Sequence, residues 1–174
     1  MHRAAQSISE KMIKVNHAGE NGAVNIYRAQ KIGAYMCAKS QLAEISHYQE
    51  HEEEHRNIFA NHLHEIGVRR CISYHLCGLG GFTLGLVTGF LGGQAIYATT
   101  YAVENVVLSH LEGQMAFLKS ADYQAYICVE KILEDERQHH DNAKAELLSD
   151  HFLTKILIKV VKLSTENVIR FGMR

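Results

Sequence analysis

The chain has 174 residues, of which 47% are hydrophobic and 21% are charged, and its formal net charge is −1. These values suit one globular domain with a full hydrophobic core, and the balanced charge argues against nucleic-acid binding. Proline and tryptophan are absent and twelve residues are histidine. Long uninterrupted helices and a metal site are therefore the first features to look for.

The cysteines and the N-terminal residues indicate a cytosolic type of compartment. No two cysteines form a C-x-x-C pair; they are Cys37, Cys71, Cys77 and Cys128. We expect reduced thiols and neither a disulfide framework nor a zinc site. Residues 1–15 are polar and lack the apolar stretch of a secretory signal.

Two helices are predicted in the first third of the chain. Ser7 or Ser9 is a suitable N-cap for a helix that runs to about Lys39. A second, highly charged helix follows and ends near Ile66, and residues 67–70 form a break. No stretch shows the alternation of a strand, so the predicted fold class is all-α.

Residues 71–103 contain no Asp, Glu, Lys or Arg. Glycines recur there at every fourth residue, a spacing typical of tightly packed helices: Gly81, Gly85, Gly89 and Gly93. The segment is long enough to span a bilayer. Its polar residues, such as His75 and Gln94, favour an apolar helix that lies on a membrane surface and lines a channel to an internal site. A wholly internal helix is the third alternative.

The second half of the chain repeats the helix–turn–helix pattern. A helix containing Glu104 runs to about Lys119, residues 120–122 form a turn and cap, and another helix ends near Leu148. Residues 151–174 are predicted to form a basic amphipathic helix. Its lysines share one face and its aliphatic residues the other, so it either binds an anionic membrane surface or docks on the bundle. The lysines are Lys155, Lys159 and Lys162.

A Glu-x-x-His motif occurs twice, as Glu52-x-x-His55 and Glu136-x-x-His139. Residues three apart on a helix lie on one face, so each pair presents a carboxylate and an imidazole to the same metal. One such motif alone is weak evidence, because a solvated charged face gives the same pattern. The spacing strengthens it, since a glutamate among small or apolar residues lies 32 residues before each motif. These glutamates are Glu20 and Glu104.

The spacing has a geometric meaning. In an antiparallel hairpin whose turn lies midway, 16 residues on each arm place all three side chains at one level, about 24 Å from the turn. Two such hairpins gather the four carboxylates and two histidines found in ferritin-like bundles that bind two iron or manganese ions. We expect Glu52 and Glu136 to bridge the metals and the other four residues to be terminal ligands.

Four segments closely resemble the demethoxyubiquinone hydroxylase family of di-iron quinol hydroxylases. They read HAGENGAVNIY at residues 17–27, EHEEEHRNIF at 50–59, TTYAVEN at 99–105 and LEDERQHHD at 133–141. The corresponding family stretches read like HAGEYGA, EKDH, TVAVEE and E-x-x-H-H-D. The resemblance implies one ferritin-like domain over residues 1–174, with the metal ligands Glu20, Glu52, His55, Glu104, Glu136 and His139.

The resemblance also implies an activity. Two iron ions per chain would activate O2 to hydroxylate the ring of a polyprenylated demethoxyquinol in ubiquinone biosynthesis. A lipid quinol substrate implies peripheral attachment to a membrane, at the cytoplasmic face of a bacterial inner membrane or the matrix face of the mitochondrial inner membrane. A homo-oligomer or a complex of ubiquinone-biosynthesis proteins is left open, and no nucleic-acid partner is expected.

Residues near the motifs are candidates for supporting roles. His17 and His110 could hydrogen-bond a ligand, although packing and surface roles compete, and Asp141 could orient a ligand histidine. The chain departs from the family at three positions: Asn21 and Leu111 replace aromatic residues, and Asn105 replaces a glutamate. All six predicted ligands are intact.

Three other functions share parts of this pattern. A ferritin-like protein that oxidises iron or another substrate would need neither residues 71–103 nor a basic tail. A di-iron hydroxylase that modifies tRNA would carry a basic patch. A helical membrane scaffold would not explain six ligands in matched positions.

Overall fold

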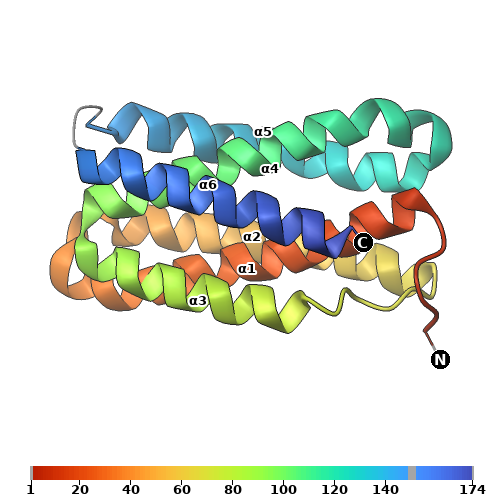
Figure 1. Ribbon diagram of the computed structural model, residues 1–174, viewed down its shortest axis with the longest axis horizontal. Helices are drawn as coiled ribbons and strands as arrows, with labels where there is room; N and C mark the ends of the chain where they lie inside the picture. The colour runs from red at the N-terminus through yellow and green to blue at the C-terminus, as the bar shows by residue number, and fades with distance from the viewer. Residues whose placement is uncertain (1, 149–151, 174) are drawn as a thin grey trace.

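The computed structural model describes residues 2–148 and 152–173, and 88% of these described residues are helical. The described residues form an all-α, ferritin-like bundle with no strands (Figure 1). Six α-helices follow a short N-terminal segment, and a 3₁₀ turn, Lys39–Gln41, joins the first two. The helices are α1 (Ile8–Cys37), α2 (Leu42–Glu65), α3 (Tyr74–Leu91), α4 (Gly93–Ala121), α5 (Tyr123–Glu146) and α6 (Phe152–Gly172).

Two helical hairpins, α1–α2 and α4–α5, form the bundle. The Ser7 side chain accepts a hydrogen bond from the backbone N–H of Glu10, whose carboxylate in turn binds the backbone of Ser7. This capping box satisfies free N–H groups and fixes the start of α1. Asp122 caps α5 by accepting a hydrogen bond from the Ala125 N–H at 3.1 Å. The predicted break after the first helix and the predicted cap at Asp122 are confirmed, but Ser120 and Ala121 still belong to α4, so the turn is shorter than predicted.

Residues 71–103 contain two helices rather than one. Gly92 has a φ of 91°, a conformation that favours glycine, and it separates α3 from α4. Gly93 therefore belongs to α4, where it faces Gln41. Sequence periodicity missed this break because the glycine spacing continues through it.

The other glycines of the repeat bring α3 onto α1. A side chain at Gly81, Gly85 or Gly89 would collide with a backbone carbonyl oxygen of α1, which belongs to Gly22, Ile26 and Gln30 respectively. The two backbones are therefore in direct contact, as a face of small residues predicts.

The opposite face of α3 is exposed. It carries large apolar side chains: Leu76, Leu79, Val87, Phe90 and Leu91. One-third of the helix is buried, and by length and composition alone it could cross a membrane. The alternative of a wholly internal helix is therefore wrong. A surface helix and a membrane span both remain predictions.

The last helix docks on the bundle through one face. Val161 is buried against α1 and α4, and the Lys162 ammonium donates a hydrogen bond to the side-chain oxygen Oδ1 of Asn105 at 2.6 Å. Large apolar residues such as Leu153 and Leu163 remain exposed on α6. His151 and Arg174, which the predicted tail helix includes, lie outside the described residues.

Candidate metal centre

The six predicted ligands come from all four helices of the bundle and meet in its interior. Their exposed fractions are only 1–4%. Glu20 lies on α1 and Glu104 on α4, while α2 and α5 each carry one Glu-x-x-His motif. The 32-residue spacing thus has the consequence that hairpin geometry predicts, since each arm brings its ligands to the same level.

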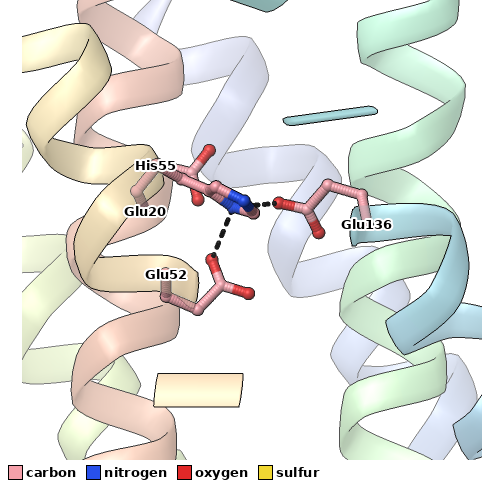
Figure 2. A group of neighbouring side chains, drawn as sticks. All are labelled: Glu20, Glu52, His55 and Glu136. Carbon is pink, nitrogen blue, oxygen red and sulfur yellow. Dashed lines mark hydrogen bonds and ion pairs between the residues drawn. The ribbon is translucent and has the colours of Figure 1, made fainter. Parts of the chain in front are cut away.

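The ligands fall into two groups that share two carboxylates. One donor atom from each of Glu20, Glu52, His55 and Glu136 lies within 4.8 Å of the other three (Figure 2). The second group satisfies the same criterion and contains Glu52, Glu104, Glu136 and His139. Glu52 and Glu136 occupy the positions that bridging carboxylates would need. Their role as bridges stays a prediction.

Both histidines turn the same ring nitrogen towards this centre. His55 Nδ1 lies 3.1 Å from Glu136 Oε1 and 3.8 Å from Glu52 Oε2. His139 Nδ1 lies 3.3 Å from Glu52 Oε1 and 4.0 Å from Glu136 Oε2. The Nε2 atom of each ring is left for contacts outside the centre. We infer that a metal would be bound through Nδ1.

Burial and mutual repulsion alter the protonation of this centre. Burial raises the pKa of Glu20 well above its usual value, and the charges of Glu136 and Glu52 raise it further. Burial, followed by the same two charges, also raises the pKa of Glu104. Without a cation to neutralise them, four carboxylates cannot all be charged in so small a volume. Burial and repulsion therefore favour the neutral, protonated forms of Glu20 and Glu104.

The neighbouring carboxylates favour the charged forms of both histidines. Burial opposes protonation of His55, but its contacts with Glu136 and Glu52 raise its pKa to about 12. Burial likewise opposes protonation of His139, and Glu52 outweighs it to raise the pKa. For Glu52 itself, burial is outweighed by the two histidines, which hold its pKa well below the usual range. Without a metal ion, protons on these groups thus offset the negative charge of the carboxylates.

The residues fit a pair of divalent metal ions. Several buried donor atoms form no hydrogen bond among the described residues: both carboxylate oxygens of Glu52, Glu136 Oε2 and His139 Nδ1. Buried polar atoms are rarely left without a partner, so a cation would satisfy them. Carboxylate and imidazole donors without a thiolate suit iron or manganese.

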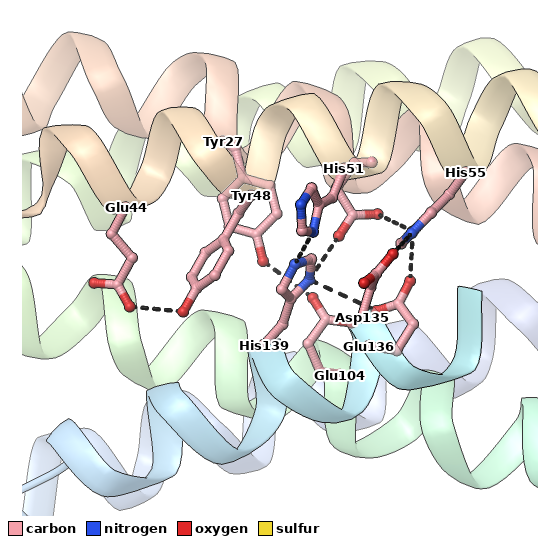
Figure 3. Close-up of polar contacts among 10 residues, drawn as sticks. Tyr27, Glu44, Tyr48, His51, His55, Glu104, Asp135, Glu136 and His139 are labelled. Atoms are coloured by element: carbon pink, nitrogen blue, oxygen red, sulfur yellow. Dashed lines mark hydrogen bonds and ion pairs between the residues drawn. The ribbon is translucent and has the colours of Figure 1, made fainter. Parts of the chain in front are cut away.

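Two contacts behind the histidines escaped the sequence analysis. Asp135 Oδ2 lies 3.1 Å from His55 Nε2, and His51 Nδ1 lies 3.1 Å from His139 Nε2 (Figure 3). Such partners fix the orientation of a ligand histidine and raise its basicity. The two histidines differ in this respect, because one partner is a carboxylate and the other an imidazole.

Two tyrosines also line the centre. The buried Tyr27 hydroxyl donates a hydrogen bond to Glu104 Oε1 at 3.1 Å and so orients that carboxylate (Figure 3). Tyr48 packs against the His139 ring with the ring centroids 4.3 Å apart. Its hydroxyl binds Glu44 at 2.6 Å, away from the centre.

The candidates for supporting roles have other positions. His17 is buried against the Tyr74 ring, with the ring centroids 4.7 Å apart, and its Nδ1 has no hydrogen-bond partner among the described residues. His110 is exposed. Asp141 binds His140 Nδ1 at 2.8 Å rather than His139. Neither of the last two therefore contacts a predicted ligand.

The three departures from the family have structural roles outside the centre. The Asn21 amide donates to the Tyr74 carbonyl oxygen at 2.9 Å and so ties α1 to α3. Asn105 accepts the hydrogen bond that ties α6 to α4. Leu111 is buried in the main hydrophobic cluster. No disulfide joins the four cysteines, and whether their thiols are reduced stays a prediction.

Comparison with known proteins gives one consistent result. A family model described as ubiquinone biosynthesis protein COQ7 matches residues 7–172. The chain is 32% identical over 178 residues to the mitochondrial NADPH-dependent 3-demethoxyubiquinone 3-hydroxylase of Dictyostelium discoideum, covering 97% of this chain and 78% of the relative.

Two further relatives support the result. The mouse mitochondrial protein of the same name is 30% identical over 157 residues, which is 86% of this chain and 71% of the relative. The 3-demethoxyubiquinol 3-hydroxylase of Burkholderia pseudomallei (strain 668) is 30% identical over 132 residues, or 76% and 62% of the two chains. With the paired Glu and Glu-x-x-His motifs buried in one bundle, these matches show that the chain belongs to the ubiquinone biosynthesis protein COQ7 family.

Proposed function

We propose that this protein is a di-iron monooxygenase that hydroxylates the ring of a polyprenylated demethoxyquinol, 5-demethoxyubiquinol, in ubiquinone biosynthesis. The observation that carries the proposal is the buried pair of ligand groups that share Glu52 and Glu136. The relatives, which are named as hydroxylases of this pathway, supply the reaction class.

Each residue of the centre has a proposed role. Glu52 and Glu136, which the two ligand groups share, would bridge the two irons, and Glu20 and Glu104 would be terminal carboxylates. His55 and His139 would each hold one iron through Nδ1. The four negative charges of the carboxylates match the four positive charges of two ferrous ions. Binding of the ions should therefore displace protons from the cluster.

The chemistry divides between the metals and the chain. Two bound irons supply O2 activation, so that one oxygen atom enters the ring and the other leaves as water with two electrons and two protons from a reductant. The chain holds the six donor groups in fixed positions and keeps water out, since all six are nearly inaccessible. Tyr27 holds Glu104 in place through its hydroxyl.

The exposed apolar surface supports a lipid substrate and attachment to a membrane. Leu84 of α3 and Leu157 of α6 pack against the same buried cluster, and both helices carry large exposed apolar side chains. A lipid quinol and a membrane surface are partners that suit this surface. We propose peripheral attachment at the cytoplasmic face of a bacterial inner membrane, or the matrix face of the mitochondrial inner membrane. Self-association or a ubiquinone-biosynthesis complex is compatible with it.

Anaerobic loading with Fe(II) tests the metal assignment. We expect about two irons per chain and their loss when Glu52 or Glu136 is changed to Ala. Glu54→Ala is the matched control, because Glu54 lies on the same helix as Glu52 but is exposed. The loaded protein should then hydroxylate a short-chain demethoxyquinol under ¹⁸O2, with one labelled oxygen in the product.

Two results would contradict the proposal. A folded, helical protein that binds no stoichiometric iron would refute the metal centre. A protein that binds two irons and oxidises Fe(II) freely, but leaves the quinol unchanged, would favour the ferritin-like alternative.

A further inference from the structure

A pocket lies away from the metal centre. It has a volume of about 510 Å³ and opens where the N-terminal segment meets the end of α2 and the start of α3 (Figure 1). None of the six predicted metal ligands lines it. Its volume is within the usual range for small-molecule sites.

The walls of this pocket are held by backbone hydrogen bonds. The Arg3 N–H donates to the Gly67 carbonyl oxygen at 2.9 Å, and the Arg69 N–H donates to the Arg3 carbonyl oxygen at 2.8 Å. Gly67 has a φ of 65°, which favours glycine and allows the chain to turn here. The pocket is therefore built into the fold rather than formed by a single loop.

Arginine and histidine side chains line the pocket, and no acidic residue that the structure describes lines it. They are His2, His64, Arg69, Arg70 and His75. Among the described residues, the arginines in ion pairs are Arg3 and Arg137, and neither lines the pocket. The charges of the two lining arginines are therefore not compensated by a carboxylate of the described chain.

Arg70 is already held in one orientation. Its guanidinium donates a hydrogen bond to His75 Nε2 at 2.8 Å and lies over the Tyr74 ring, 4.8 Å from its centroid. Because Arg70 can only donate, His75 must accept through Nε2 and keep its proton on Nδ1. Less side-chain entropy is then lost when an anion binds.

We propose that this pocket binds a phosphate ester, with the phosphate on Arg69 and Arg70 and an apolar or aromatic group against Val68 and Ile72. The planar guanidinium fork matches two phosphate oxygens and makes strong charge-assisted hydrogen bonds. Val68 and Ile72 line the same pocket, and the volume exceeds that of a phosphate alone.

A series of side-chain contacts connects the pocket to α1. The Tyr74 ring, on which Arg70 lies, contacts the ring of His17, one helical turn before Glu20. Burial lowers the pKa of His17 to about 4, and the charges of Arg56 and Arg70 contribute to this shift. A phosphate on Arg70 would therefore offset one of the positive charges that act on His17 of α1.

Phosphate esters of two origins carry this chemistry. A soluble nucleotide would place its base on the apolar wall, whereas a phospholipid would place its headgroup there and its chains along the exposed Ile72 and Leu76. The experiment must separate these two sources.

The test compares soluble and vesicle-bound phosphate on the full chain. Equilibrium dialysis measures binding of ADP, and co-sedimentation measures binding to phosphatidylcholine vesicles with and without phosphatidic acid. Arg70→Gln and Arg69→Gln should each weaken the binding by about tenfold or more, since each removes a charged hydrogen bond. Arg28→Gln is the matched control, because Arg28 is exposed on α1 and does not line the pocket. Arg70→Lys, which keeps the charge but loses the fork, should give an intermediate affinity.

Every outcome bears on the proposal. One ADP per chain, lost in Arg70→Gln and kept in Arg28→Gln, supports a soluble nucleotide. A preference for phosphatidic acid that depends on Arg70 in the same way supports a phospholipid headgroup. The proposal is overturned if neither probe distinguishes Arg70→Gln from Arg28→Gln while both variants keep the wild-type helical content. Failure of the iron-loading test would leave this result unchanged, because the pocket contains no metal ligand.

Discussion

The unequal contacts behind His55 and His139 predict two metal sites of unequal sensitivity to mutation. Asp135 Oδ2 lies 3.1 Å from His55 Nε2, whereas the corresponding partner of His139 is His51. Removing such an outer partner typically lowers metal affinity by about 10–100-fold, which corresponds to about 1.4–2.7 kcal/mol. The Asp135 side chain is 41% exposed, so water screens its charge. We therefore expect Asp135→Asn to weaken one of the two sites by about tenfold.

Stepwise anaerobic titration with Co(II), followed by its visible absorption, measures this effect. His51→Ala should weaken the other site, so the two variants should change different binding steps. Glu134→Gln is the matched control: Glu134 neighbours Asp135 in the chain but is 84% exposed and pairs with Arg137. The reasoning fails if the two variants weaken the same step, or if Glu134→Gln has the same effect as Asp135→Asn.

Three further predictions concern packing and protonation. Gly85→Ala should destabilise the fold by about 1–3 kcal/mol, because the new methyl group meets the Ile26 carbonyl oxygen; Gly80→Ala, with open space, should be neutral or stabilising, as thermal unfolding will show. Metal binding should release protons and weaken as the pH falls, because the raised pKa values of Glu20, Glu104, His55 and His139 favour their protonated forms. Calorimetry in buffers of different ionisation enthalpy measures the release, and binding that releases no protons would contradict these pKa shifts. The hydrogen bond from Arg3 lowers the pKa of Glu10 to about 2. The charged Glu10 carboxylate therefore stabilises the fold fully above about pH 4.3, and this stabilisation is lost as the pH falls towards 2. In Glu10→Gln the free energy of unfolding should depend less on pH in that range, as acid unfolding will show.

Sequence periodicity was sufficient to predict the hairpins and the six residues of the centre. The reason is that helix geometry is regular: equal spacing from a turn determines the level of a residue, and a separation of three determines its face. The same arithmetic argues against two of the supporting residues. Asp141 is two residues after His139, about 200° around the helix, and His110 is six residues after Glu104, about 240° around.

The outer contacts could not be predicted in this way. Whether Asp135 reaches His55 depends on the rotation of α5 relative to α2 and on side-chain torsions, neither of which local spacing determines. Histidines are frequent on α2, so the sequence did not distinguish His51 from His47. Gly92 was missed for a related reason, because a backbone angle rather than its spacing sets it apart from the other glycines.

The direct backbone contact between α1 and α3 also has a mechanical consequence. No side chains lie between the helices at Gly81 and Gly85 that could rearrange to let one slide past the other. Helix α1 carries Glu20, and α3 carries much of the apolar surface proposed to meet the lipid. Under that proposal, the two helices move as one rigid body, and the height of the metal centre above the membrane plane is set by how deeply α3 is embedded.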